Sequence, residues 1–462
     1  MKSGLEPRAA ILELGDDFYD AVTAADFPTT ILRFRNDRAA ASVGLDALGD
    51  ADWVRHFGRF VPLAGSLETP LALRYHGHQF RTYNPELGDG RGFLFAQVED
   101  ARGRLLDLGT KGSGPTPWSR AGDGRLTLKG GVREVLATEM LEALGLDTSK
   151  TFSLIETGEQ LARGDEPSPT RSAVMVRLSH SHIRYGSFQR LAALDLPEDM
   201  RRLVDYVLRH YFGSAGVPVF ADTEAQVAAL IDHAVSGAAR QAAGMMAAGF
   251  VHGVLNTDNI NITGECFDYG PYRFAPTWDP DFTAAYFDHH GLYSFGRQPE
   301  ALQWNVFQLA GALRLLVGVE TLTPALKDFG ARYDAALAAA LIARLGVVSQ
   351  GAARDGAVAV ALMAALEASG VGLDGFWFDW RGGKLRRNAR AYGHPGFGAL
   401  AAALDGYAAV AMDHEYWDDN APCGLLIAEI ETIWAAIAEA HDWTPFAAKL
   451  AAVRRMGAAM RG

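Results

Sequence analysis

The sequence predicts an α+β fold in which a β-rich N-terminal lobe is followed by a helical C-terminal lobe. Three observations support this prediction. Short apolar runs alternate with glycine-rich turns over residues 71–131. Beyond residue 188, apolar residues recur mainly at helical spacing. One polar segment, residues 250–295, interrupts these helices, and irregular polar segments of this kind often carry function.

The β-rich lobe is expected to span residues 1–187, and its first stretch, to about residue 73, mixes short helical and irregular signals. Strands are expected at 92–98 and 104–109, with a hairpin turn at 100–103 between them, and another strand at 174–178. An amphipathic helix is expected at 132–144, where Gly145 ends it.

The helical lobe is expected to span residues 188–462. Its longest predicted helix is Ala-rich and covers 225–248. Further helices are predicted at 299–316, 335–345, 358–368 and 425–440.

Composition excludes several classes of protein. The 462 residues are 49% hydrophobic, so a core can be buried, and the net charge of -12 argues against a general nucleic-acid or anionic-membrane binder. Cys266 and Cys423 are too few for a disulfide framework or a four-cysteine zinc site. The N-terminus lacks a signal-peptide core, and the longest nearly apolar run, 357–366, is too short to span a bilayer. We expect a cytoplasmic monomer with no nucleic-acid or membrane partner.

The most informative motif lies in the polar segment, where residues 252–259 read HGVLNTDN and residues 267–270 read FDYG. Protein kinases carry H-R-D-x-x-x-x-N followed by D-F-G, and His252 and Asn259 keep that separation. An amide oxygen and a carboxylate from two loops suit magnesium bridging phosphates, so Asn259 and Asp268 are the predicted metal ligands. The alternative is two polar turns in which Asn and Asp only cap helices or close Asx-turns.

One departure from the kinase pattern concerns the proton acceptor. The kinase catalytic Asp would fall at Val254, and a valine cannot accept a proton. Asp258, beside Asn259, is the nearest replacement. A carboxylate at this place would sit differently relative to the metal, so a different phosphorus of ATP could be attacked.

Glycine-rich turns upstream indicate a phosphate cradle. Residues 87–92, LGDGRG, combine Gly88 and Gly90 with Arg91, so that backbone N–H groups and a guanidinium can approach phosphate oxygens. Lys111, with Glu134 on the next helix, resembles the kinase lysine–glutamate pair. Most such turns are only turns, and a surface lysine with a solvated glutamate is the commoner arrangement.

Two further features extend the cradle. A third glycine turn follows at residues 122–125. Arg177 and Arg184 either are exposed charges or neutralise phosphate oxygens remote from the metal. The histidine groups 76/78, 180/182 and 289/290 lack the spacing of a zinc motif, so we expect structural histidines.

Five runs carry a resemblance to a known family: HGHQFRTYNPELGDGRG, DLGTKGSGPTPWSRAGDGR, VRLSHSHIRYGSF, FVHGVLNTDNINITGECFDYGPY and WDPDFTAAYFDHHGLYSFGRQPEALQWN. They closely resemble the SelO/YdiU family (selenoprotein O, protein adenylyltransferase) over residues 71–316, and the match is much weaker from about residue 345. The resemblance implies a protein-kinase-like bilobal fold and ATP bound in a flipped orientation. It also implies AMP transfer to Ser, Thr or Tyr of proteins with release of pyrophosphate.

Residue roles follow from the resemblance, with ATP as substrate and Mg²⁺, or Mn²⁺ in its place, as cofactor. Asp258 would accept the proton, and Asn259 and Asp268 would hold the metal. Nucleotide contacts would come from the remaining residues: Gly88, Gly90, Arg91, Lys111 held by Glu134, Asp123, Gly124, Arg177 and Arg184.

Two other functions stay open from the sequence. The first is an ATP-dependent phosphotransferase, a kinase, against which Val254 argues. The second is a non-catalytic ATP-binding pseudokinase scaffold, which would have no need to retain the acid of Asp258.

Overall fold

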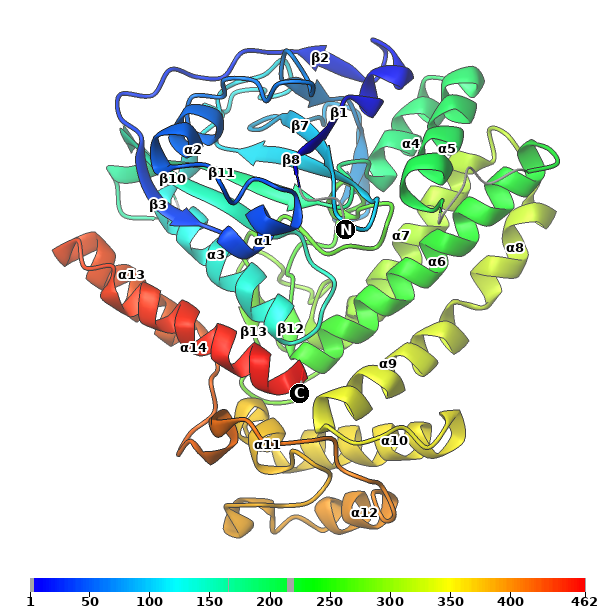
Figure 1. Cartoon of the computed structure of the whole chain (residues 1–462). Coiled ribbons are helices and arrows are strands. Elements are labelled where there is room, and N and C mark those ends of the chain that lie inside the picture. The colour runs from blue at the N-terminus through cyan, green and yellow to red at the C-terminus, as the bar shows by residue number, and fades with distance from the viewer. Residues whose placement is uncertain (1–3, 165, 214–219, 462) are drawn as a thin grey trace.

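A nine-stranded antiparallel sheet forms the N-terminal part of the computed structural model, which describes residues 4–164, 166–213 and 220–461 (Figure 1). The main path of the sheet is β2-β4-β7-β8-β11-β10-β3, with β1 paired to β7 and β9 to β11. The strands are β1 (Glu6–Arg8), β2 (Tyr19–Ala21), β3 (Ile31–Arg35), β4 (Leu71–Leu73), β7 (Leu94–Glu99), β8 (Leu105–Lys111), β9 (Leu126–Thr127), β10 (Lys150–Leu161) and β11 (Thr170–Ser179).

Both faces of this sheet are buried. Successive residues of β11 alternate between two cores: Val174 and Val176 pack in one with Trp53 of α2 (Asp50–Phe57). Ala173 and Met175 pack in the other, against α3 (Leu128–Ala143). The helices on the two faces thus hold the inner strands in a fixed register.

Most of the remaining regular structure is helical, and α6 (Thr223–Ala248) and α7 (Gln298–Leu313) run side by side in Figure 1. Two small hairpins, β5 (Gly77–Gln79) with β6 (Thr82–Asn84) and β12 (Phe250–Val251) with β13 (Arg273–Phe274), lie outside the main sheet. The remaining helices are α1 (Asp37–Ser42), α4 (Tyr185–Ala193), α5 (Pro197–Tyr211), α6 (Thr223–Ala248), α7 (Gln298–Leu313), α8 (Val319–Lys327), α9 (Phe329–Leu345), α10 (Ala352–Ser369), α11 (Leu373–Asp379), α12 (Pro395–Ala403), α13 (Ile427–Ala440) and α14 (Thr444–Arg461), with 3₁₀ turns at Ala10–Leu14, Thr257–Asn259 (η2), Phe295–Arg297, Ala389–Tyr392 and Glu415–Asp418.

Most elements predicted from the sequence are confirmed. β7 and β8 match the first two expected strands, β11 the third, and the turn between β7 and β8 closes with Gly103 N–H donating to Asp100 O at 2.9 Å. The predicted helix at 132–144 begins four residues earlier, because the Thr127 hydroxyl caps it by accepting from Gly130 N. α6, α7, α9, α10 and α13 match the five predicted helices of the C-terminal part.

The last two helices return to the N-terminal part of the fold. Arg454 of α14 makes a bidentate contact with Glu139 of α3, at 2.8 and 3.0 Å. Lys129 of α3 pairs with Glu431 of α13 at 2.7 Å. The C-terminal helices therefore brace the helix that carries Glu134.

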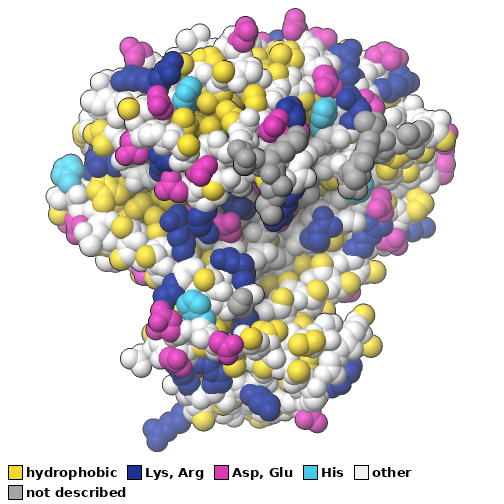
Figure 2. Space-filling view, viewed as in Figure 1, with side chains coloured by type: hydrophobic (Ala, Val, Ile, Leu, Met, Phe, Trp, Pro, Cys, Tyr) yellow, Lys and Arg dark blue, Asp and Glu magenta, His cyan; other side chains and the backbone are white. Residues whose placement is uncertain are grey.

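The surface charges and the cysteines can be described directly from the structure. None of the helices described is long and apolar enough to cross a membrane. On the face drawn in Figure 2, Lys and Arg side chains are interspersed with Asp and Glu rather than gathered into one broad basic patch. Cys266 is buried, Cys423 is partly exposed, and both are free thiols.

Candidate functional site

A cavity of about 590 Å³ opens between the sheet and the polar segment of residues 250–295. It collects residues that lie far apart in the sequence. Its lining contains seven Lys or Arg and four Asp, so this part of an acidic protein suits an anion. The lining residues are Tyr75, Gln79, Leu87, Gly88, Asp89, Gly90, Arg91, Gly92, Thr110, Lys111, Trp118, Ser119, Arg120, Ala121, Gly122, Asp123, Gly124, Arg125, Arg163, Arg177, Arg184, Asp258 and Asp268.

The first two glycines of this lining are required by packing. A Cβ on Gly88 would overlap the Trp118 ring, and one on Gly90 would lie 2.8 Å from Trp118 O. Hydroxyl groups then fasten the two segments together: Thr116 donates to Asp89 O at 2.6 Å and Ser119 donates to Gly90 O. Residues 116–119 therefore fold over the 87–92 turn and form one wall of the cavity.

A buried charge cluster lies at the end of β8. Lys111 Nζ contacts Glu134 Oε2 at 2.6 Å and Asp268 Oδ1 at 2.7 Å. Arg177 Nη1 lies 3.4 Å from Asp268 and 3.5 Å from Glu134. Burial alone would raise the pKa of Asp268. Nearby positive charges have the larger effect and hold this pKa well below its usual value; they belong to Lys111, Arg177, Arg91 and Arg184. Asp268 is therefore ionised.

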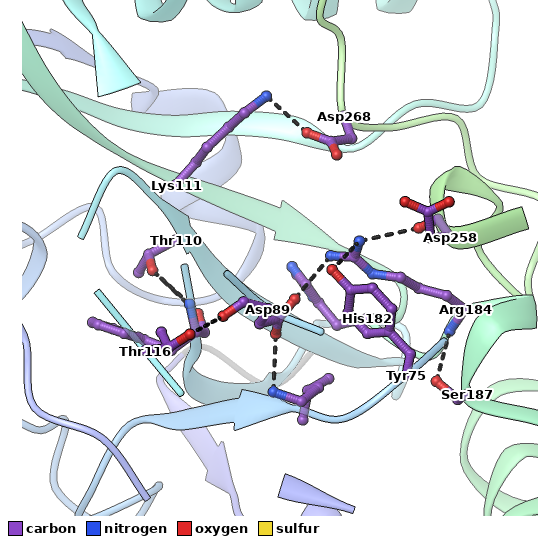
Figure 3. A network of polar contacts seen from close by, with 12 residues as sticks. Tyr75, Asp89, Thr110, Lys111, Thr116, His182, Arg184, Ser187, Asp258 and Asp268 are labelled. Carbon is purple, nitrogen blue, oxygen red and sulfur yellow. Dashed lines mark hydrogen bonds and ion pairs between the residues drawn. The ribbon is translucent and has the colours of Figure 1, made fainter. Parts of the chain in front are cut away.

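Arg184 connects the sheet side of the cavity to the polar segment (Figure 3). Its guanidinium donates to Tyr75 Oη and to Asp258 O, each at 3.0 Å, and to Asp89 Oδ1 at 3.1 Å. The same group lies over the Tyr75 ring, 4.3 Å from its centroid. With three partners, the guanidinium has a fixed position in the cavity wall.

Asp258 occupies the middle of η2 and is only 7% exposed. Its Oδ1 is buried without a hydrogen-bond partner in the described structure. Burial raises the pKa of this carboxyl to about 6, although the charge of Arg184 acts in the opposite direction. A carboxyl with this pKa exchanges a proton near neutral pH, as a general base must.

His252 joins the two halves of the predicted motif. Its Nε2 donates to Phe267 O at 3.0 Å, and its Nδ1 accepts from Val254 N at 3.4 Å. Burial lowers the pKa of His252, so the ring is neutral, in keeping with one donor and one acceptor nitrogen. The loop before Asn259 and the loop before Asp268 are thereby held in contact.

Ten of the predicted site residues line the cavity: Gly88, Gly90, Arg91, Lys111, Asp123, Gly124, Arg177, Arg184, Asp258 and Asp268. Glu134 lies behind Lys111 and reaches the cavity only through it. Asn259 adjoins Asp258 but does not itself line the cavity, and its Nδ2 donates to Val254 O at 3.1 Å. Asp123 lies at the rim, where Arg163 engages its carboxylate at 2.8 Å.

Sequence reasoning did not name several residues of the wall, among them Tyr75, Asp89 and Trp118. Asp89 stands between the two glycines of the first turn, so its position was already a usable signal. No local pattern indicates Tyr75 or Trp118, because both belong to the site only through tertiary packing.

Comparisons with known proteins show the family to which this chain belongs. The family model described as Protein adenylyltransferase SelO matches residues 3–389. A protein named Protein nucleotidyltransferase YdiU from Gloeobacter violaceus is 44% identical over 96% of this chain and 93% of its own length. Proteins of the same name from Synechocystis and Trichormus variabilis are 50% and 49% identical, over 74% and 73% of this chain and 70% and 68% of their own lengths. The chain therefore belongs to the SelO family of protein adenylyltransferases.

Proposed function

We propose that this protein transfers AMP from ATP to Ser, Thr or Tyr hydroxyls of other proteins and releases pyrophosphate. One observation carries the proposal: a buried carboxyl with a raised pKa, Asp258, shares an arginine-lined cavity with the Lys111–Asp268 cluster. Position 254, where a kinase would have its base, is a valine. Membership of the SelO family supports the same reaction.

The two ends of the cavity suggest how ATP lies. Lys111 and Arg177 are 4% and 3% exposed, whereas Arg120 and Asp123 at the rim are exposed. Buried cations suit the leaving pyrophosphate, because charge that develops away from water is stabilised most strongly. The adenosine would then point to the rim and the α-phosphorus toward Asp258, which is the flipped orientation expected for the family.

In this mechanism the acceptor hydroxyl oxygen bonds to the α-phosphorus. The bond from that phosphorus to the bridging oxygen of pyrophosphate breaks, and pyrophosphate leaves with the electron pair. Asp258, as a carboxylate, takes the hydroxyl proton. Lys111, Arg177 and Arg184 neutralise phosphate charge, and positioning supplies most of the rate, as in phosphoryl transfer.

The residues present fit a divalent ion. Asn259 Nδ2 donates a hydrogen bond to Val254 O, so Oδ1 is the atom of this amide that can ligate a cation. Asp268 is ionised and can supply a second oxygen ligand. Oxygen donors of this kind suit Mg²⁺ or Mn²⁺. Bound there by Asn259 and Asp268, the ion would supply positive charge to the phosphate oxygens.

The arrangement also supports a protein-kinase-like, two-lobed organisation with residues 1–187 and 188–462 as its parts. In this interpretation Lys111 on β8 and Glu134 on α3 form the ion pair of the first lobe. The polar segment of the second lobe contributes Asp258 and Asp268 to the same cavity.

Labelled ATP tests the proposal. The purified protein is incubated with a bacterial lysate and Mg²⁺ or Mn²⁺, in parallel with ATP labelled at the α- or the γ-phosphate. We expect protein-bound label only from α-labelled ATP, with a mass increase equal to AMP on Ser, Thr or Tyr. Label from the γ-phosphate alone would indicate a kinase, and ATP binding with no transfer would indicate a scaffold.

A further inference from the structure

The β5–β6 hairpin, residues 77–84, packs on the turn that carries Asp258. It forms a separate two-stranded sheet outside the main one. Only Gln79 of this hairpin lines the cavity, so the other hairpin residues are not placed to bind nucleotide. The position of the hairpin therefore indicates a role other than nucleotide binding.

Backbone N–H groups of the hairpin bind side chains of the turn. His78 N donates to Thr257 Oγ1 at 2.7 Å, and Phe80 N donates to Asn256 Oδ1 at 3.0 Å. The Thr257 hydroxyl in turn donates to Gln189 Oε1 at 2.6 Å. Because Thr257 is fully buried, these bonds compete with no water, and they fix the residue directly before Asp258 from two sides.

The hairpin also contacts the carboxyl of Asp258. A Cβ built on Gly77 would lie 3.0 Å from Asp258 Cβ and 3.1 Å from its Oδ1. Gln79 lines the same cavity as Asp258, and Asn84 Nδ2 donates to Gln79 Oε1 at 3.2 Å, which holds this side chain at the cavity wall.

We propose that the β5–β6 hairpin is a positioning element for the proton acceptor. Thr257 fixes the backbone before Asp258, and Gly77 leaves just enough space for the carboxyl to lie close to the hairpin. This inference rests on the proposed function, because the hairpin can position a proton acceptor only if Asp258 abstracts the proton. A displacement of about 1 Å at such a group can cost about 100-fold in rate.

A pair of substitutions at Thr257 separates positioning from folding. Thr257→Val keeps the shape but leaves His78 N–H and Gln189 Oε1 without their partner, whereas Thr257→Ser keeps the hydroxyl. We expect Thr257→Val to lower the maximum rate of α-label transfer to lysate proteins about tenfold to 100-fold. The KM for ATP and the Kd for Mg-ATP by calorimetry stay within about twofold, and Thr257→Ser restores at least half the rate.

Two further variants complete the experiment. Tyr392→Phe removes a buried hydroxyl that donates to Asp379 at 2.8 Å in the C-terminal part, and it should leave the rate unchanged. Gly77→Ala keeps every hydrogen bond and adds one methyl group against Asp258, so it should lower the maximum rate even if Thr257→Val does not fold.

The outcomes distinguish the two proposals. If Gly77→Ala and a folded Thr257→Val both keep the wild-type maximum rate, the positioning role is wrong and the proposed function still stands. A rate loss accompanied by an equal loss of Mg-ATP affinity also overturns it, because the hairpin would then act on nucleotide binding. Absence of α-label transfer by the wild-type protein overturns the proposed function and the positioning role with it.

Discussion

Among single residues, Asp258 determines the expected pH dependence. Its pKa is raised to about 6 by burial, and only the carboxylate can accept a proton. The kcat/KM for transfer should therefore fall about tenfold for each pH unit below 6 and level off above it. Initial rates of α-label incorporation between pH 5 and 8 measure this limb, and a flat profile across that range would contradict the assignment.

Replacement of the same residue tests its role directly. Asp258→Asn keeps the shape of the side chain and removes its basicity, so we expect transfer to fall at least 100-fold, in line with the range for general-base catalysis. Calorimetry should show Mg-ATP affinity largely intact. A matched substitution at an exposed carboxylate outside the cavity, Asp413→Asn, should retain the rate.

Lys111 is expected to contribute to ATP binding as well as to the rate of AMP transfer. Lys111→Met removes the cation that lies 2.6 Å from Glu134 and 2.7 Å from Asp268, which leaves two acids next to incoming phosphates. We expect at least tenfold weaker ATP binding, measured by calorimetry. An exposed lysine outside the cavity, Lys384, provides the control, and Lys384→Met should bind ATP as the wild type does.

Among secondary-structure elements, the contact between α14 and α3 gives a prediction at a distance from the cavity. Arg454→Ala removes the bidentate partner of Glu139, a carboxylate with 2% exposure, at a cost of about 1 kcal/mol, because Glu139 keeps its contacts with Arg38 and Asn36. Because α3 carries Glu134, the transfer rate should fall as well. Chemical denaturation and α-label transfer measure the two effects.

A more exposed ion pair provides the control for this prediction. Arg332 pairs with Asp232, whose side chain is 53% exposed, and such pairs contribute about 0–1 kcal/mol. Arg332→Ala should therefore change stability little and leave transfer unchanged. Equal losses of stability and rate in both variants would show that the Arg454 contact has no particular importance.

The sequence predicted those elements whose own residues show a clear apolar spacing or turn pattern. β7, β8 and α6 follow from apolar spacing and turn residues, and their outlines were correct. β10 was missed although it is the longest strand described, because its alternation of polar and apolar residues covers only residues 151–154 and breaks at Ile155. β3 was missed because it joins the sheet only by pairing with β10.

The site shows the same division. Lys111, Glu134 and Asp268 stand in motifs with fixed spacing, so the sequence indicated all three. Tyr75 stands in no motif. The β5–β6 hairpin lies within the first of the five resembling runs, but nothing in that run indicates its role, because it reaches Asp258 only through packing on the turn. Long-range packing of this kind leaves no local signal in a single sequence.

At the scale of the whole molecule, a second buried acid affects stability. Burial raises the pKa of Glu265 to about 8, with the charge of Asp147 adding to the effect. Because the folded pKa exceeds the unfolded value of 4.5, folding binds a proton between these values, and its contribution to stability is lost as pH rises from about 4.5 to 8. Glu265→Gln should remove that dependence.

Denaturant titrations of both proteins at several pH values measure this effect. The stability of the wild type relative to Glu265→Gln should decrease steadily from pH 5 to pH 8. A constant difference between the two proteins over this range would mean that Glu265 is ionised in the folded state and that its neighbours compensate the charge.

The return of α14 to α3 has a consequence for synthesis of the protein. The residues that form this contact are 315 positions apart, so the ribosome completes α3 long before its partner exists. Until then, α3 packs on β10 and β11 but lacks its contact with α14. Nucleotidyl transfer is therefore expected to reach its full rate only after α14 has been made and has docked on α3.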